Sequence, residues 1–319
     1  MTDTDQLPAN PHPKKPSQTK NKSITLSQGF PGHAAHWEAL LGTQAGDSEP
    51  TAWIHQALDE VSAQSPTNSA RFCLLSNHRE ISTQLVFELS DQAEPNRLAF
   101  AVPAIRSPHR YKAQLLKVWK SALAEQSLLE LDLGADIKVF AYHLDHLRLN
   151  LDWSQTEKLE VSLSGLALDI EASDKGQLLH IRDAKSIQQH RALIELLLQN
   201  EANLPSDSRA QIKALIEEGK LPKEPITLSL DQMCAYLYSE ELGQQDEAWC
   251  RGEVIGKQLV TIFSKNFLLL DVVVLREPDT LPVVIRVAVN EDLAPKPLKI
   301  GDFVQGNIWL QASVCVKPG

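Results

Sequence analysis

The stretch LKIGDFVQGNIWLQASV, residues 298–314, constrains the fold more than any other part of the chain, because its residues alternate strictly in character. A period of two is typical of a β-strand, whose successive side chains point to opposite faces. One set of alternate positions is apolar and predicts a core face formed by Val304, Ile308, Leu310 and Val314. The intervening set mixes aromatic side chains with amides: Phe303, Gln305, Asn307, Trp309 and Gln311.

Two explanations of this aromatic–amide face remain open. In the first, a helix from the region 183–241 covers the face, and Trp309 anchors two domains by donating its indole N–H to a backbone carbonyl. In the second, the face is exposed, and the five residues Phe303, Gln305, Asn307, Trp309 and Gln311 bind a protein partner. A solvent-accessible Trp309 favours the second explanation, and a fully buried Trp309 excludes it.

Composition describes an ordinary globular chain. It has 319 residues, of which 43% are hydrophobic and 23% charged, and this length suggests about two domains. Residues 1–26 lack periodicity and are rich in Pro, Lys and Ser, which predicts a disordered tail. Four dispersed cysteines without a CxxC pair, and no secretory signal, favour reduced thiols and a cytoplasmic, soluble protein. No apolar run approaches membrane-spanning length.

The charge balance argues against nucleic acid as a partner. The formal net charge is -10, and an acidic surface repels a phosphate backbone. Residues 245–319, where aromatic side chains could stack bases, carry eight Lys or Arg against nine Asp or Glu. Single-stranded nucleic-acid binding through this region is therefore an alternative and not the main hypothesis.

Local patterns place helices and strands along the rest of the chain. Apolar residues at helical spacing predict helices over 31–64, 107–122, 183–200, 206–218 and 230–241. Alternating or short apolar runs predict a three-stranded meander over 71–103 and strands over 147–153 and 158–171. In the last of these the apolar phase switches at Ser164–Gly165, which predicts a β-bulge or a tight turn. The segment KLPKEP, residues 220–225, is the best candidate for a domain boundary.

The last 70 residues are again strand-like. FLLLDVVVL and LPVVIRVAV predict a hairpin in which Asp271 lies opposite Arg286, because a lone charge inside an apolar strand needs a partner. A glycine-bearing first strand, the hairpin, a loop and then GDFVQG resemble the small OB-type barrels over residues 245–316. That resemblance implies an antiparallel barrel, although four strands are counted where such a barrel has five.

We therefore expect an α+β fold with two domains behind the tail. Residues 27–222 form a domain of sheets and helices, and residues 223–319 form a helix followed by the OB-like barrel.

No motif identifies a catalytic, metal or cofactor site. RGEVIGKQ lacks the glycine spacing and the hydroxyl of a phosphate-binding loop. In HLDH a strand points His143 and His146 to opposite sides, which argues against a metal site shared by the two. A metal site would need the distant Asp152 and His180 to join one of them in space. In HAAHWE a helix brings His33 and His36 to one face, but no third ligand is apparent.

These observations leave three hypotheses. The main one is a non-enzymatic cytoplasmic protein that recognises a protein partner, with no cofactor. The alternatives are single-stranded nucleic-acid binding through the C-terminal barrel, and an enzyme, for example a metal-dependent hydrolase. The enzyme's site would assemble from distant residues near His143, His146 and His180. The partner's identity and the oligomeric state stay open.

Overall fold

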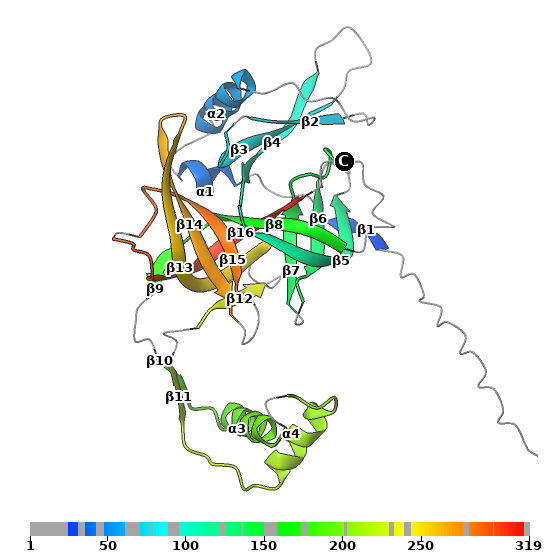
Figure 1. Cartoon of the computed structure of the whole chain (residues 1–319), viewed down its shortest axis with the longest axis vertical. Coiled ribbons are helices and arrows are strands. Elements are labelled where there is room, and N and C mark those ends of the chain that lie inside the picture. Colours follow the sequence, from blue (N-terminus) through cyan, green and yellow to red (C-terminus); the bar gives the residue numbers. More distant parts are fainter. Residues whose placement is uncertain are drawn as a thin grey trace, which may run out of the picture.

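The computed structural model of the chain contains one large sheet, a small three-stranded sheet, and a pair of helices that projects from the body (Figure 1). The structure describes residues 25–30, 36–42, 48–60, 71–76, 78–88, 96–121, 126–134, 137–149, 158–173, 178–200, 203–229, 233–238, 244–276, 281–295 and 297–315.

Two runs of four consecutive strands form the centre of the large sheet. The first run is β5 (Arg110–Ser121), β6 (Ser127–Asp132), β7 (Lys138–His143) and β8 (Lys158–Ala167). The second run is β13 (Glu247–Ile262), β14 (Lys265–Leu275), β15 (Val283–Asn290) and β16 (Phe303–Val314). Within each run, the first three strands pair antiparallel in order. Three short strands extend the sheet: β1 (Thr25–Phe30), β9 (Glu171–Ser173) and β12 (Ala235–Tyr238).

The strands β8 and β16 join the two runs. They pair antiparallel, from Leu310 opposite Gly165 to Val314 opposite Val161. On its other edge, β8 pairs with β5 and then, in parallel, with β15. In the same way β16 pairs with β13 and then, in parallel, with β7. The pairings therefore close two five-stranded rings, β5–β6–β7–β16–β8 and β13–β14–β15–β8–β16, which share the β8–β16 pair.

Because they belong to both rings, β8 and β16 are buried on both faces. Every residue of β8 from Val161 to Ala167 is buried. The register of β8 against β16 continues without a shift through Ser164 and Gly165, so the bulge or turn expected there is wrong. The apolar phase switches because both faces of the strand meet apolar neighbours. Gly165 also allows close packing, since a Cβ there would lie 3.3 Å from Ile308 Cδ1.

A second layer covers the outer face of the large sheet. It contains α1 (Trp37–Leu41), α2 (Ser48–Asp59) and the small sheet of β2 (Arg71–Leu75), β3 (Ile81–Glu88) and β4 (Arg97–Ile105). A second apolar core lies between this layer and the large sheet, and Trp53 of α2 is buried in it. The Trp53 indole N–H donates to Thr83 Oγ1 at 2.8 Å, and its ring packs edge to face against Phe267 of β14. The meander expected over 71–103 is confirmed, and the helix expected over 31–64 is confirmed in part as α1 and α2.

Residues 178–229 form a separate piece, which we call the helical module. A two-stranded stalk, β10 (Leu178–Ile181) with β11 (Ile226–Ser229), carries α3 (Ala184–Gln199) and α4 (Ser208–Glu217) away from the large sheet (Figure 1). Asp183 caps α3 by accepting the Ser186 backbone N–H at 2.8 Å. Gly219 follows α4 with a left-handed φ of 69°. The helices expected over 183–200 and 206–218 are confirmed.

The expected α+β fold, with a separate small antiparallel barrel in residues 223–319, is wrong. The structure is dominated by strands, and the strands β13–β16 belong to the same mixed sheet as β5–β8. The ring that contains β13–β16 takes its fifth strand, β8, from outside residues 223–319, about eighty residues before β13. Pairing across such a sequence separation leaves no local pattern, so counting strands along the last 70 residues cannot find it.

The helix expected over 107–122 is the strand β5. A register irregularity lies between Leu115 and Lys117 of this strand. The buried positions therefore move from Ala113 and Leu115 to Val118 and Ser121. The irregularity changes the spacing of the buried residues from two to three positions, and this mixed spacing resembles that of a helix.

Two other expectations also fail in the described residues. Within 230–241, Ala235–Tyr238 is the strand β12, because the edge of β13 is available to pair with it. Within 147–153, residues up to 148 belong to a turn that follows β7, and residues 150–153 lie outside the described part of the chain.

The expected hairpin and its ion pair are confirmed. Asp271 of β14 lies directly opposite Arg286 of β15. Arg286 Nε donates to Asp271 Oδ1 at 2.8 Å, and Arg286 Nη2 donates to Oδ2 at 3.0 Å. His109 Nε2 lies 3.0 Å from the same carboxylate. This ties the loop before β5 to the hairpin.

Candidate functional site

The residues expected to dock a partner on β16 lie inside the protein or are bonded to neighbouring strands. Trp309 is 0% exposed, and its indole N–H donates to Asp246 Oδ2 at 2.8 Å. The rings of His36 and Tyr142 each lie 5.1 Å from it. An exposed patch centred on Trp309 is therefore not formed. The expectation that a helix from 183–241 covers Trp309 is also wrong, because His36 and Tyr142 lie against its ring. The indole N–H donates to a carboxylate and not to the expected backbone carbonyl.

The other members of the aromatic–amide face have structural contacts. Gln311 is fully buried, accepts the Ile105 N–H at 2.9 Å and donates to Pro103 O at 2.9 Å, which fastens β4 to β16. Phe303 is buried, and the Arg251 guanidinium carbon lies 5.5 Å from its ring centre. Gln305 bonds Glu171, and Asn307 bonds Asp169. The period of two on β16 is confirmed, because the apolar set lines the core of the rings: Val304, Ile308, Leu310 and Val314.

The histidines singled out in the sequence do not converge. His143 is buried in β7 beside Ser127 Oγ at 3.1 Å, with the His146 ring 5.9 Å away. Burial, and then the charge of His146, hold the pKa of His143 well below its usual value. His180 lies on the stalk of the helical module, 3.1 Å from Thr227 Oγ1. Asp152 lies outside the described residues.

His36, the other histidine considered as a metal ligand, also lacks a set of neighbouring ligands among the described residues. His36 precedes α1 and lies 3.1 Å from Glu247 Oε1, while its expected neighbour His33 lies outside the described residues. Within the described ranges, no group of three or more His, Cys, Asp or Glu side chains could hold a metal ion.

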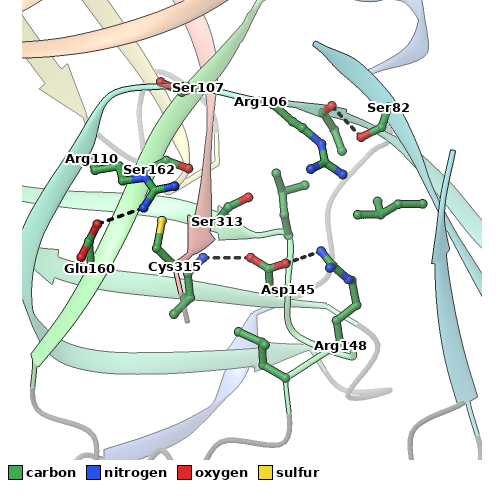
Figure 2. Close-up of a pocket in the computed structure, with 15 residues that line it drawn as sticks. Ser82, Arg106, Ser107, Arg110, Asp145, Arg148, Glu160, Ser162, Ser313 and Cys315 are labelled. Atoms are coloured by element: carbon green, nitrogen blue, oxygen red, sulfur yellow. Dashed lines mark hydrogen bonds and ion pairs between the residues drawn. The ribbon is translucent and has the colours of Figure 1, made fainter. Parts of the chain in front are cut away.

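One cavity, which we call the arginine pocket, opens where several elements end (Figure 2). It has a volume of about 490 Å³ and lies between the small covering sheet and the shared strands. Its polar lining is Ser82, Arg106, Ser107, Arg110, Asp145, Arg148, Glu160, Ser162, Ser313 and Cys315. Its apolar lining is Leu75, Ala104, Leu144, Leu149 and Val314. The residues come from the small sheet, the loop before β5, the turn after β7, β8 and the end of β16.

Two of the three arginines are held by carboxylates. Arg148 Nη1 donates to Asp145 Oδ1 at 2.7 Å, while Asp145 Oδ2 accepts the Val314 N–H at 2.8 Å. Burial raises the pKa of Asp145, and the charge of Arg148 opposes that shift. Arg110 Nη1 lies 3.3 Å from Glu160 Oε1 across the pocket wall. Each carboxylate therefore already has a cationic partner.

Arg106 is different. Its backbone N–H donates to Glu80 O at 2.8 Å, but its guanidinium has no hydrogen bond or ion pair with any residue in the part of the chain that the structure describes. Partial burial lowers the pKa of Arg106, and the positive charge of Arg148 lowers it further. Figure 2 shows the Arg148 guanidinium beside Asp145 and the Arg106 guanidinium above it, with both reaching into the same part of the pocket. The sequence did contain a signal for this site, because Arg106 and Arg110 lie four positions apart in the segment RSPHR between two strands. The wrong helix assigned to 107–122 concealed it.

The helical module carries the second candidate surface. A groove of about 620 Å³ runs between its helices and is lined by Gln189, His190, Leu193, Arg209, Ile212, Lys213, Ile216 and Glu217. No residue of α4 is buried, and α3 buries only Ile187, Ala192 and Leu196. Leu198 is 78% exposed, and Ile194 and Leu204 are exposed as well.

Comparison of the chain with protein-family models, curated proteins and solved structures found no match. Among the described residues, no helix is both long enough and apolar enough to cross a membrane. The arginine pocket and the groove of the helical module are therefore the two surfaces from which a function can be inferred.

Proposed function

We propose that this protein is a non-enzymatic cytoplasmic interaction protein that recognises a protein partner through its helical module. The observation that carries the proposal is the projecting pair α3–α4, with its apolar groove and exposed leucine and isoleucine side chains. Exposed apolar patches of this kind mark interaction sites, because leaving them in water is unfavourable unless a partner covers them.

The groove suits an amphipathic helix of the partner. Leu193, Ile212 and Ile216 line it, and an apolar groove is the usual acceptor for apolar residues of a helix spaced at i, i+3, i+4 and i+7. The groove carries Arg209 and Lys213 against one acid, Glu217, which pairs with Lys213 at 3.8 Å. The remaining positive charge of Arg209 favours a partner helix with acidic flanks.

Site-specific photo-crosslinking in the producing cells tests the proposal. A photoreactive residue is placed at Ile212 in the groove, and a matched control is placed at Ile300, which is 65% exposed on the main body. We expect a discrete protein adduct from position 212 and none of the same mass from position 300. The absence of an adduct at 212, or the same adduct at both positions, would contradict the proposal.

A charge introduced inside the groove sharpens the test. With the photoreactive residue at Leu198, the change Ile212→Asp should abolish the adduct, because a buried carboxylate in an apolar contact is strongly unfavourable. The control Lys220→Asp, on an exposed residue that follows α4, should leave the adduct in place. An adduct that survives Ile212→Asp would place the partner elsewhere on the module.

A further inference from the structure

We infer that the arginine pocket is a binding site for a phosphoryl group carried by a small molecule. This inference concerns a different surface from the helical module and does not depend on the proposed function.

The charge of the pocket is the first observation. Three arginines face two carboxylates there, which leaves one excess positive charge in a chain whose net charge is -10. Asp145 and Glu160 are each engaged by an arginine at 2.7 and 3.3 Å. An incoming anion therefore meets arginines whose neighbouring carboxylates are already neutralised.

The arrangement of Arg106 and Arg148 is the second observation. Two cations that reach into one space repel each other, and an anion placed between them removes that repulsion. Arg148 is held in position by Asp145, which is itself buried and held by the Val314 N–H. The planar guanidinium of Arg106 feels the charge of Asp145 but forms no hydrogen bond or ion pair with a described residue, so its fork of donors is available to two oxygens of one ligand group.

The remaining lining indicates the size and character of the ligand. A volume of about 490 Å³ falls within the range for organic ligands and exceeds the volume of one phosphate ion. Leu75, Leu144 and Leu149 add apolar side chains to the lining, which suits the carbon part of a phosphorylated molecule. The hydroxyls of Ser107 and Ser162 add neutral groups along the same lining.

Phosphoryl is favoured over carboxylate by its oxygens and charge. A phosphoryl group presents three terminal oxygens and close to two negative charges at neutral pH, and it can bridge two guanidinium groups at once. A carboxylate presents two oxygens and one charge, so it would engage Arg106 and leave no oxygen to accept from the remaining donors of Arg148.

Equilibrium dialysis of the full chain with radiolabelled inorganic phosphate, at constant ionic strength, tests the inference. We expect saturable binding, weakened about tenfold or more by Arg106→Gln because a charge-assisted hydrogen-bonding partner is lost. The control Arg97→Gln removes an arginine that is 81% exposed at the other end of β4, and it should leave the affinity unchanged. Unfolding curves of both variants check that they remain folded.

Three results would overturn the inference. The first is phosphate binding that does not saturate. The second is an equal loss of affinity in Arg97→Gln and Arg106→Gln, which indicates general surface charge. The third is competition by acetate as effective as competition by unlabelled phosphate, which would remove phosphoryl as the chemical class. Tighter binding of n-butyl phosphate than of inorganic phosphate would support a contact with the apolar lining residues.

Discussion

The shared strands β8 and β16 differ from the helical module in how deeply their residues are buried and in how far along the sequence their neighbours lie. In β16, Trp309, Leu310 and Gln311 are three successive residues with no exposed surface. In α4, no residue is buried at all. The shared strands obtain their neighbours from distant parts of the sequence, whereas the module pairs mainly within itself, α3 with α4 and β10 with β11.

This difference indicates which part of the molecule provides its stability, and it fits the recognition role proposed for the helical module. Burial of apolar surface is the main favourable term in folding, so the double ring and its covering layer stabilise the molecule. The module contributes little buried surface and keeps apolar residues in water, which suits a part that another protein covers. Four changes, taken from the largest expected effect to the smallest, test this division.

The largest effect is expected at Trp309. The change Trp309→Ala removes a fully buried ring and leaves the Asp246 carboxylate without its indole donor, and we expect a loss of about 3–5 kcal/mol in the free energy of unfolding. Denaturant unfolding followed by far-ultraviolet circular dichroism measures it. Trp309→Phe keeps a ring but not the N–H and should lose about 1–3 kcal/mol. Equal effects of the two variants would mean that packing of the ring contributes nothing.

The Asp271–Arg286 pair should have an intermediate, pH-dependent effect. Burial alone would raise the pKa of Asp271, but hydrogen bonds from Arg286 and His109 outweigh it and hold that pKa below its ordinary value. A carboxyl with a lowered folded-state pKa stabilises the fold fully above its unfolded-state pKa of about 3.9. That stabilisation is lost as the pH falls through the lower folded-state value.

A double-mutant cycle of Arg286→Gln and Asp271→Asn measures this contribution. At pH 7 we expect each single variant to lose about 2 kcal/mol, with coupling between the two sites. At a pH below the folded-state pKa the coupling should disappear. Coupling that is independent of pH would show that hydrogen bonding to the neutral acid, and not the charge, joins the strands.

A small and local effect is expected at the start of α3. The side chain of Asp183 accepts the Ser186 N–H, and this hydrogen bond lowers the pKa of Asp183. Asp183→Ala should speed hydrogen exchange of the first-turn amides of α3 and leave the amides of β8 and β16 unchanged. Asp207→Ala is the matched control, because Asp207 precedes α4 without a side-chain capping bond. Faster exchange in β8 would show that the module and the rings unfold together.

Removal of the helical module should have the smallest effect on the rest of the molecule. Replacing residues 182–225 with a short Asn-Gly turn between Ile181 and Ile226 preserves the pairing of β10 with β11. All six tryptophans lie outside residues 178–229, so their fluorescence reports on the remainder alone. We expect an unchanged denaturant midpoint. A lower midpoint would show that the module supports the rings, and it would weaken the division made above.

Local patterns identified most elements whose partners lie nearby. The meander β2–β4 and the hairpin β14–β15 connect through short segments, and α3 and α4 have local helix signals, so residues within a few positions carry the information. The Asp271–Arg286 register follows from the same hairpin. The candidate site was not found, because Arg106, Arg148 and Glu160 come from separate elements and share no spacing.

The sequence by itself determined the strand character of β16 and which of its faces is apolar, because side-chain alternation is a property of the local backbone. Only the tertiary structure decided what covers the other face. Trp309 is enclosed by His36, Tyr142 and Asp246, three residues distant in sequence from it and from one another. The same holds for the rings themselves, since β8 completes a ring begun by β13 about eighty residues later. Pairing at that separation depends on how the whole chain closes, and no local pattern records it.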